Sequence, residues 1–225
     1  AASDVYKRQA QDVYFNYRQL LSTGYRHDNC QFYMPGFWYR RNLRSPKKAP
    51  SFHTSDSWLV REDRLSAPLT GIFSEKEKRF MTVNRLDDFS MDALATHKEG
   101  EIILSGKTSL GFTGFENQQG IAMLSFGFPY REAPKSYIRK LTLAPEVEAF
   151  QLMKKGESVL LTWEIMESGA DDFSDFIQHT WEHCYDTYAP KPVENSYSIA
   201  DMKQVLSCFF VNLSLIHISE PTRPY

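Results

Sequence analysis

The hydrophobic periodicity of this chain changes near residue 169, and that change limits the fold more than any other feature. Before it, short apolar runs end at turn residues, which predicts β-strands. The clearest run is "GESVLLTWEIM" (residues 156–166), with Val159, Leu161, Trp163 and Ile165 on one face. After the change, apolar residues recur at steps of three and four, which predicts helices. We therefore expect a mainly β chain with helices at its C-terminal end.

Several runs before the change predict individual strands. "GIFSEKEKRFMTV" (residues 71–83) predicts a hairpin with a charged connector. "GIAMLSFGFP" (residues 120–129) is apolar on both faces, which indicates a strand buried on both sides. "EIILSG" and "YIRKLTL" predict two more strands. Because turn residues recur at the spacing of a sandwich, we predict an antiparallel β-sandwich over residues 10–168.

Two helices are predicted after the sandwich. The first contains an aromatic stripe at helical spacing: Phe173, Phe176, Ile177, Trp181, Cys184, Tyr185 and Tyr188. Asp171 and Asp172 stand at its start, where negative charge favours the helix dipole. Residues 169–195 thus form a linker helix and a proline-rich joint. Ser198 and Asp201 resemble a capping box, which predicts the start of a second helix over residues 196–212.

The two ends of the chain have an unexpected relation. Leu213–Ile218 can be encoded by a DNA segment whose reverse complement encodes Asp4–Gln9. Inverted repeats of this kind flank inserts in transposase-based sequencing libraries, so we expect residues 1–9 and 213–225 to be translated adapter. On this interpretation the chain is an interior fragment, and residues 196–212 are the first helix of a truncated all-α domain.

Charge and cysteine content exclude several classes of function. The formal net charge is −2, which argues against a nucleic-acid-binding surface. No apolar run reaches membrane-spanning length. The three cysteines are far apart and lack metal-ligand spacing, and "HTWEH" (residues 179–183) does not match the zinc motif. We predict no metal site and no cofactor.

Aromatic residues make up 14 % of the chain, and one cluster of them predicts a binding site. "QFYMPGFWYRRN" (residues 31–42) supplies the candidates Tyr33, Trp38, Tyr39, Arg40 and Arg41. Aromatic faces stack on the C–H faces of sugars, and arginine binds carboxylates through two parallel hydrogen bonds. The combination suits an acidic glycan. The alternative is that the rings belong to the core and the arginines are solvated.

Two further segments supply candidates with equally plain alternatives. "SFHTSDSWLVREDR" (residues 51–64) contributes His53, Asp56, Trp58 and Arg61, although alternating charges are typical of surface ion pairs. "FPYREAP" (residues 128–134) contributes Tyr130 and Arg131 at the end of an apolar strand, where functional residues collect. An Arg–Glu pair that holds a turn would explain the second segment as well.

The order of these parts resembles a known group of enzymes. The chain runs from a sandwich that ends in "KGESVLLTWEI" through an aromatic helix and a proline-rich joint to a first helix. This order resembles the N-terminal half of bacterial polysaccharide-degrading enzymes that join a β-supersandwich to an (α/α)6 toroid. "MPGFWYRRN" and "SFHTSDSWLVREDR" are similar to segments of gut Bacteroidetes glycan-utilisation proteins. The resemblance leaves glycoside hydrolase and polysaccharide lyase both open.

The resemblance implies different roles for the two domains. Catalytic residues would lie in the downstream helical domain, so this part would be non-catalytic, would brace that domain and would add aromatic and arginine contacts to a glycan site. An oligo- or polysaccharide partner and a periplasmic or cell-surface location are implied. The alternatives are a glycan-binding or surface-assembly protein without catalysis, and a purely structural sandwich whose rings are all buried.

Overall fold

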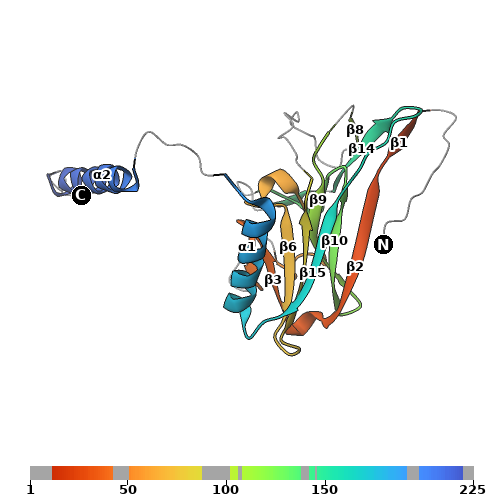
Figure 1. Ribbon diagram of the computed structural model, residues 1–225, viewed down its shortest axis with the longest axis horizontal. Helices are drawn as coiled ribbons and strands as arrows, with labels where there is room; N and C mark the ends of the chain where they lie inside the picture. Colours follow the sequence, from red (N-terminus) through yellow and green to blue (C-terminus); the bar gives the residue numbers. More distant parts are fainter. Residues whose placement is uncertain are drawn as a thin grey trace. The chain divides into compact units, whose positions relative to one another are not determined.

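The computed structural model describes residues 12–42, 51–87, 102–105, 108–137, 142–144, 146–191 and 198–219. The chain divides into two units, residues 1–187 and 188–225, and each unit is described by itself. Within the described residues the protein is mainly β, with open antiparallel sheets followed by two helices (Figure 1). This confirms the predicted fold class.

Two antiparallel sheets form the body of the first unit. The one we call the β2 sheet has the strand order β2 (Tyr17–Arg26), β10 (Ile121–Phe128), β9 (Phe112–Gln118) and β5 (Ser57–Arg61). The one we call the β15 sheet has the order β15 (Trp163–Gly169), β7 (Arg79–Arg85), β6 (Leu69–Ser74), β3 (Cys30–Met34) and β4 (Trp38–Arg40). The hairpin predicted from residues 71–83 is β6 and β7, so that prediction is confirmed.

Smaller elements complete the β part. β1 (Val13–Phe15), β14 (Val147–Met153) and β11 (Arg131–Glu132) form a third sheet, in which β8 (Ile102–Ser105) pairs with β14 in parallel. β12 (Lys135–Tyr137) and β13 (Thr142–Ala144) form a two-stranded ribbon. Two single turns of 3-10 helix, η1 (His27–Asn29) and η2 (Glu62–Arg64), follow β2 and β5.

The β2 and β15 sheets pack face to face, which makes the sandwich. Their main core cluster draws on both sheets: Cys30, Phe32, Met34, Trp38, Ile72, Met81 and Val83 from the β15 sheet, and Tyr25, Trp58, Val60, Phe115, Ala122, Leu124 and Phe126 from the β2 sheet. The ring centroids of Trp38 and Trp58 are 5.8 Å apart, and those of Phe32 and Phe115 are 5.1 Å apart. Edge-to-face contacts between large rings therefore join the two sheets.

Helix α1 (Phe173–Tyr188) covers the other face of the β15 sheet (Figure 1). Phe176 is fully buried, and its ring lies 4.9 Å from that of Phe80 and 6.0 Å from that of Phe73. Gly71 permits this approach, because a Cβ added there would lie 2.7 Å from Phe176 Cζ. The predicted helix is confirmed, and the sequence change near residue 169 marks the start of a third layer.

The start of α1 is capped by a side chain, where the sequence analysis expected only negative charge that favours the helix dipole. Asp172 Oδ1 accepts hydrogen bonds from the backbone N–H groups of Ser174 (2.7 Å) and Asp175 (2.9 Å). Those two backbone bonds hold the pKa of Asp172 below its ordinary value. The helix therefore begins where a carboxylate satisfies two of its free N–H groups.

The buried face of α1 is narrower than the predicted stripe. The helix buries Phe173, Phe176, Thr180 and Cys184. Trp181 is 39 % exposed and Tyr185 is 65 % exposed, so these two members of the stripe are not buried. The buried face is centred where Gly71 lets the helix approach the sheet, and the two rings lie at its margin.

Two strand predictions also need correction. The run at residues 156–166 becomes a strand only from Trp163, because β7 ends at Arg85, the partner of Trp163, and residues 156–162 pair with no strand in the described part of the chain. The run "YIRKLTL" is not one strand, since Tyr137 in β12 pairs antiparallel with Thr142 in β13. Alternating polarity does not reveal where a chain turns back.

Helix α2 (Ile199–Ser219) belongs to the second unit. Asp201 N donates to Ser198 Oγ (3.1 Å) and Ser198 N donates to Asp201 Oδ2 (3.0 Å), which confirms the predicted capping box. The helix continues through residues 213–219, which the sequence analysis assigns to adapter. That it opens a truncated helical domain stays a prediction. Among the described helices, none combines the length and the apolar character that crossing a membrane requires.

Candidate functional site

Exposed aromatic rings gather where β4 meets α1, and we call Tyr39, Trp181 and Tyr185 the aromatic surface. Tyr39 is 53 % exposed. The ring centroids of Tyr33 and Tyr39 lie 5.4 Å apart, and Trp181 Nε1 donates to Tyr33 Oη at 2.6 Å. Tyr39 and Trp181 therefore contact the same buried tyrosine. Tyr185 stands one helical turn beyond Trp181 on the same side of α1.

The support beneath this surface is rigid and apolar. Tyr33 is only 2 % exposed, and burial raises its pKa to about 12. Tyr33 also meets the ring of Phe176 edge-on at 6.1 Å. Because Tyr33 stays neutral and is held from three sides, it fixes the positions of both Tyr39 and Trp181.

Arg40 supplies a positive charge beside the aromatic surface. It is the last residue of β4 and has a left-handed backbone conformation (φ 58°). Its guanidinium lies over the ring of Phe173, 5.2 Å from the centroid, and the residue is exposed. A cation and three accessible rings are thus available on one side of the molecule.

Four of the predicted binding residues are core residues. Tyr33, Trp38, Trp58 and Tyr130 are at most 2 % exposed. A ring with no accessible face cannot stack on a sugar, so these four cannot contact a ligand in this structure. Along β3 and β4 the pleat sends Trp38 into the sandwich and leaves Tyr39 on the side of α1. The alternative that the rings are core holds for Trp38 and Trp58 and fails for Tyr39.

The remaining predicted arginines are largely engaged by neighbouring groups. Arg61 binds both carboxylate oxygens of Asp63 at 2.6 and 2.7 Å. Arg131 pairs with Glu146 and lies 3.7 Å from Glu148 Oε1, so it joins β11 to β14. Arg41 Nε donates to the backbone oxygen of Cys30 (3.0 Å). These contacts favour the structural alternative for all three.

His53 and Asp56 lie in the loop before β5. Asp56 Oδ1 accepts from Asn117 Nδ2 at 3.0 Å, so its carboxylate holds the end of β9. His53 is exposed and lines an apolar hollow of about 180 Å³ that Arg41 also lines. His27 lies in the wall of this hollow, and burial lowers its pKa. The structure brings His53 and Arg41 to one hollow, which Tyr39 does not line.

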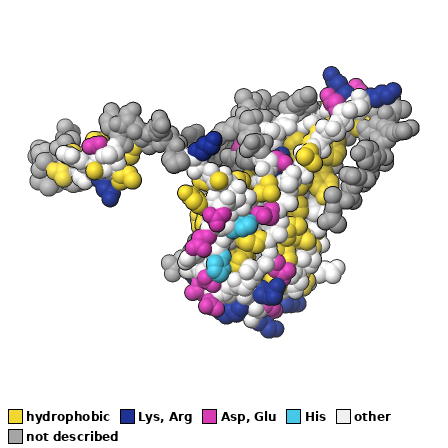
Figure 2. Space-filling view, in the orientation of Figure 1, with side chains coloured by type: hydrophobic (Ala, Val, Ile, Leu, Met, Phe, Trp, Pro, Cys, Tyr) yellow, Lys and Arg dark blue, Asp and Glu magenta, His cyan; other side chains and the backbone are white. Residues whose placement is uncertain are grey.

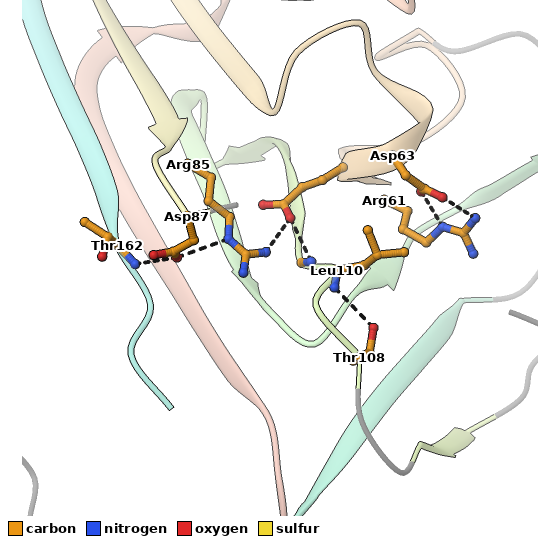
Figure 3. A network of polar contacts seen from close by, with 9 residues as sticks. Arg61, Asp63, Arg85, Asp87, Thr108, Leu110 and Thr162 are labelled. Atoms are coloured by element: carbon orange, nitrogen blue, oxygen red, sulfur yellow. Dashed lines mark hydrogen bonds and ion pairs between the residues drawn. The ribbon is translucent and has the colours of Figure 1, made fainter. Parts of the chain in front are cut away.

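A buried polar network closes one end of the sandwich (Figure 3). Arg85 Nη1 donates to Glu62 Oε2 at 2.6 Å, and Arg85 Nε lies 3.3 Å from Asp87 Oδ2. Glu62 Oε2 also accepts from Gly111 N (2.7 Å), and Asp87 Oδ2 accepts from Thr162 N (2.7 Å). These bonds link η2 and the start of β9 to the end of β7 and the start of β15. Burial raises the pKa of Glu62, and Arg85 and Gly111 N offset part of that rise.

A pocket of about 370 Å³ adjoins this network. Its walls are formed by Arg85, Asp87, Thr108, Ser109, Phe128, Gln151, Glu157, Ser158, Val159, Leu160 and Leu161. Gln151 is 7 % exposed, and its Oε1 has no hydrogen-bond partner among the described residues. The pocket therefore combines hydrogen-bonding groups with one aromatic ring.

The two histidines of α1 have separate acidic neighbours. His183 Nε2 lies 2.7 Å from Glu164 Oε2 of β15, whereas His179 Nε2 lies 3.5 Å from Asp175 Oδ1 of its own helix. Figure 2 shows histidine and acidic side chains close together on the face of the molecule where α1 lies. Within the residues that the structure describes, no group of three potential metal ligands is found.

The sequence analysis missed Arg85, Gln151 and the exposed rings of α1. The available signals were an arginine at the end of an apolar strand and a glutamine in the inward row that starts with Val147 and Ala149. Neither signal distinguishes a site from a structural contact without the fold. In comparisons with known families, curated proteins and solved structures, nothing matches this chain.

Proposed function

We propose that this chain is the N-terminal β-sandwich part of a polysaccharide-degrading enzyme, and that its aromatic surface binds glycan. The observation that carries the proposal is the exposure of Tyr39 and Trp181 over the same buried Tyr33, with the exposed Tyr185 one helical turn beyond Trp181. Soluble proteins bury most of their large rings, so a group of accessible ones marks an interaction surface.

Sugar is the ligand class that this chemistry favours. Accessible rings stack on the C–H faces of pyranoses, and their own polar atoms reach hydroxyl groups at the rim. Arg40 adds a cation that suits a uronide carboxylate, which is the acidic glycan expected from the sequence. Catalysis would come from the helical domain that the resemblance implies, and the sandwich would brace it.

The proposal is tested with two tyrosines that can be changed with little risk to the fold. Tyr39→Ala and Tyr185→Ala remove exposed rings, and Tyr14→Ala, on β1 and 50 % exposed, is the matched control. Affinity electrophoresis or calorimetry against neutral and uronide polysaccharides gives the affinities. We expect each site variant to bind roughly two- to tenfold more weakly, because a stacked ring contributes about 0.5–1.5 kcal/mol.

The outcomes separate the hypotheses. Equal loss of binding in Tyr14→Ala, or no binding of any polysaccharide by the wild-type chain, would remove the glycan assignment. Arg40→Ala is expected to weaken binding of uronides selectively. Binding without any hydrolysis or elimination by the full-length gene product would favour the glycan-binding protein without catalysis.

A further inference from the structure

We propose that the pocket beside the Arg85 network is a second binding site, which takes a neutral, hydroxyl-rich ligand the size of one or two sugar rings. The choice of ligand class rests on the proposed function, but the site itself does not. The pocket lies at the end of the sandwich between β10, β14 and residues 157–161, and none of the aromatic surface residues lines it.

The first argument is the position of Gln151. The inward face of β14 carries Val147 and Ala149, which are fully buried in an apolar cluster with Leu110 and Tyr130. Gln151 continues the same row but carries an amide, and the amide oxygen has no partner among the described residues. A buried acceptor without a partner is disfavoured, so a ligand hydroxyl that donates to it gains more than it would in water.

The second argument is the mixture of groups around that amide. Ser158 adds a hydroxyl that can donate and accept, while Thr108 and Asp87 line the pocket with polar groups that already have partners within the protein. Phe128 also lines the pocket, but its ring is buried, with the Arg85 guanidinium 5.4 Å from its centroid, so it adds apolar wall and no stacking face. A small ligand that carries several hydroxyl groups matches this mainly polar lining.

The third argument is charge, which excludes an anion. Arg85 is the pocket's one positively charged lining residue in the described part of the chain, and it already faces Glu62 and Asp87. Glu157 adds a second carboxylate to the lining. No positive charge is left to balance a phosphate or a uronide, so the ligand of this site is neutral. In this respect the pocket differs from the surface beside Arg40.

The fourth argument is shape. A volume of about 370 Å³ lies at the lower end of the range for small-molecule sites. Leu160 is 86 % exposed and Val159 is 38 % exposed, so the outer wall presents apolar side chains to solvent that a ligand would cover.

The test measures binding of methyl glycosides of glucose, galactose, mannose and xylose to the purified chain by protein-observed NMR. Methyl glucuronide is the anionic comparison. We expect at least one neutral glycoside to bind with a Kd in the millimolar range, about 1–10 mM, as is usual for small polar ligands. Shifts should appear at the amides of Ser109, Val159 and Leu160, and the glucuronide should bind more weakly.

Two variants link that binding to the pocket. Gln151→Leu replaces the amide by an apolar group of similar size and should weaken binding about tenfold, whereas Gln118→Leu, at an exposed position of β9, should not. Leu160→Ala alters an exposed wall residue without risk to folding and should also weaken binding. Tyr185→Ala should leave these shifts unchanged.

Either of two outcomes contradicts the pocket assignment. If no neutral glycoside shifts the pocket amides, or if Gln151→Leu and Leu160→Ala both bind as tightly as Gln118→Leu, the pocket assignment is overturned. Because Tyr39→Ala and Tyr185→Ala report on the aromatic surface alone, its failure and the failure of the pocket are distinguishable.

Discussion

Replacing Arg85 should lower the unfolding free energy of the sandwich strongly, because Arg85 forms a buried ion pair with Glu62. Its side chain is 3 % exposed and that of Glu62 is 1 % exposed, with 2.6 Å between Arg85 Nη1 and Glu62 Oε2. Arg85→Met keeps an apolar stem of similar length but leaves Glu62 buried opposite no cation. Removing one partner of a buried pair costs about 3–5 kcal/mol of unfolding free energy. We expect a loss of that size at pH 8.

The pH dependence of the variant follows from Glu62. Burial raises the pKa of Glu62 in the folded protein, and removal of Arg85 takes away a group that lowers it, so the pKa rises further. A group whose pKa is raised on folding adds stability below its unfolded pKa and loses it as the pH rises through the folded pKa. Arg85→Met should therefore regain part of its stability relative to wild type as the pH falls from 8 towards about 5.

Urea unfolding followed by tryptophan fluorescence and circular dichroism measures these differences. Glu62→Gln in the Arg85→Met background should recover most of the loss at pH 8 and remove the extra pH dependence. Arg79→Met breaks an exposed pair with Glu167 and should change little. The reasoning is refuted if Arg85→Met loses less than about 1 kcal/mol at pH 8, or if the added Glu62→Gln brings no recovery.

Two further predictions concern packing and thiol chemistry. Gly71→Ala should lower the free energy of unfolding in urea by about 1–3 kcal/mol, because its Cβ would lie 2.7 Å from Phe176 Cζ. Gly169→Ala is the control and should change it little, because its Cβ meets only Lys78 O at 3.6 Å. Equal stabilities of the two variants would contradict the close contact between α1 and β6. Burial raises the pKa of Cys30 to about 12 and that of Cys184 to about 11, while Cys208 is exposed. Ellman's reagent should therefore titrate one thiol rapidly in the native chain and none in Cys208→Ser, and rapid reaction of that variant would show that the other two thiols are accessible.

Local patterns in the sequence were sufficient for several elements. The β6–β7 hairpin, the helical stripe of α1 and the capping box of α2 all depend on residues that are neighbours along the chain. A cap is satisfied within three residues, and a hairpin joins adjacent segments, so the sequence alone specifies both.

Local sequence patterns predicted less of the candidate site. The sequence located the aromatic run around residues 31–42, but not which of its rings would be exposed. Alternation along β4 assigns Trp38 and Tyr39 to opposite faces; only the pairing of sheets decides that the β2 sheet covers the first and that α1 leaves the second accessible. Arg131 meets Glu146, which the chain brings close only by folding, whereas Arg61 pairs with Asp63, two residues further along the chain.

The order of β-strands followed by helices can be inferred from the pattern of apolar residues, because the period of that pattern indicates which backbone geometry can bury one face. The start of β15, the buried face of α1 and the pocket lined by Arg85, Gln151 and Phe128 emerge only from the folded arrangement. The reason is that pairing partners, ion pairs and cavities depend on contacts between distant segments, and a periodic pattern carries no information about which segments meet.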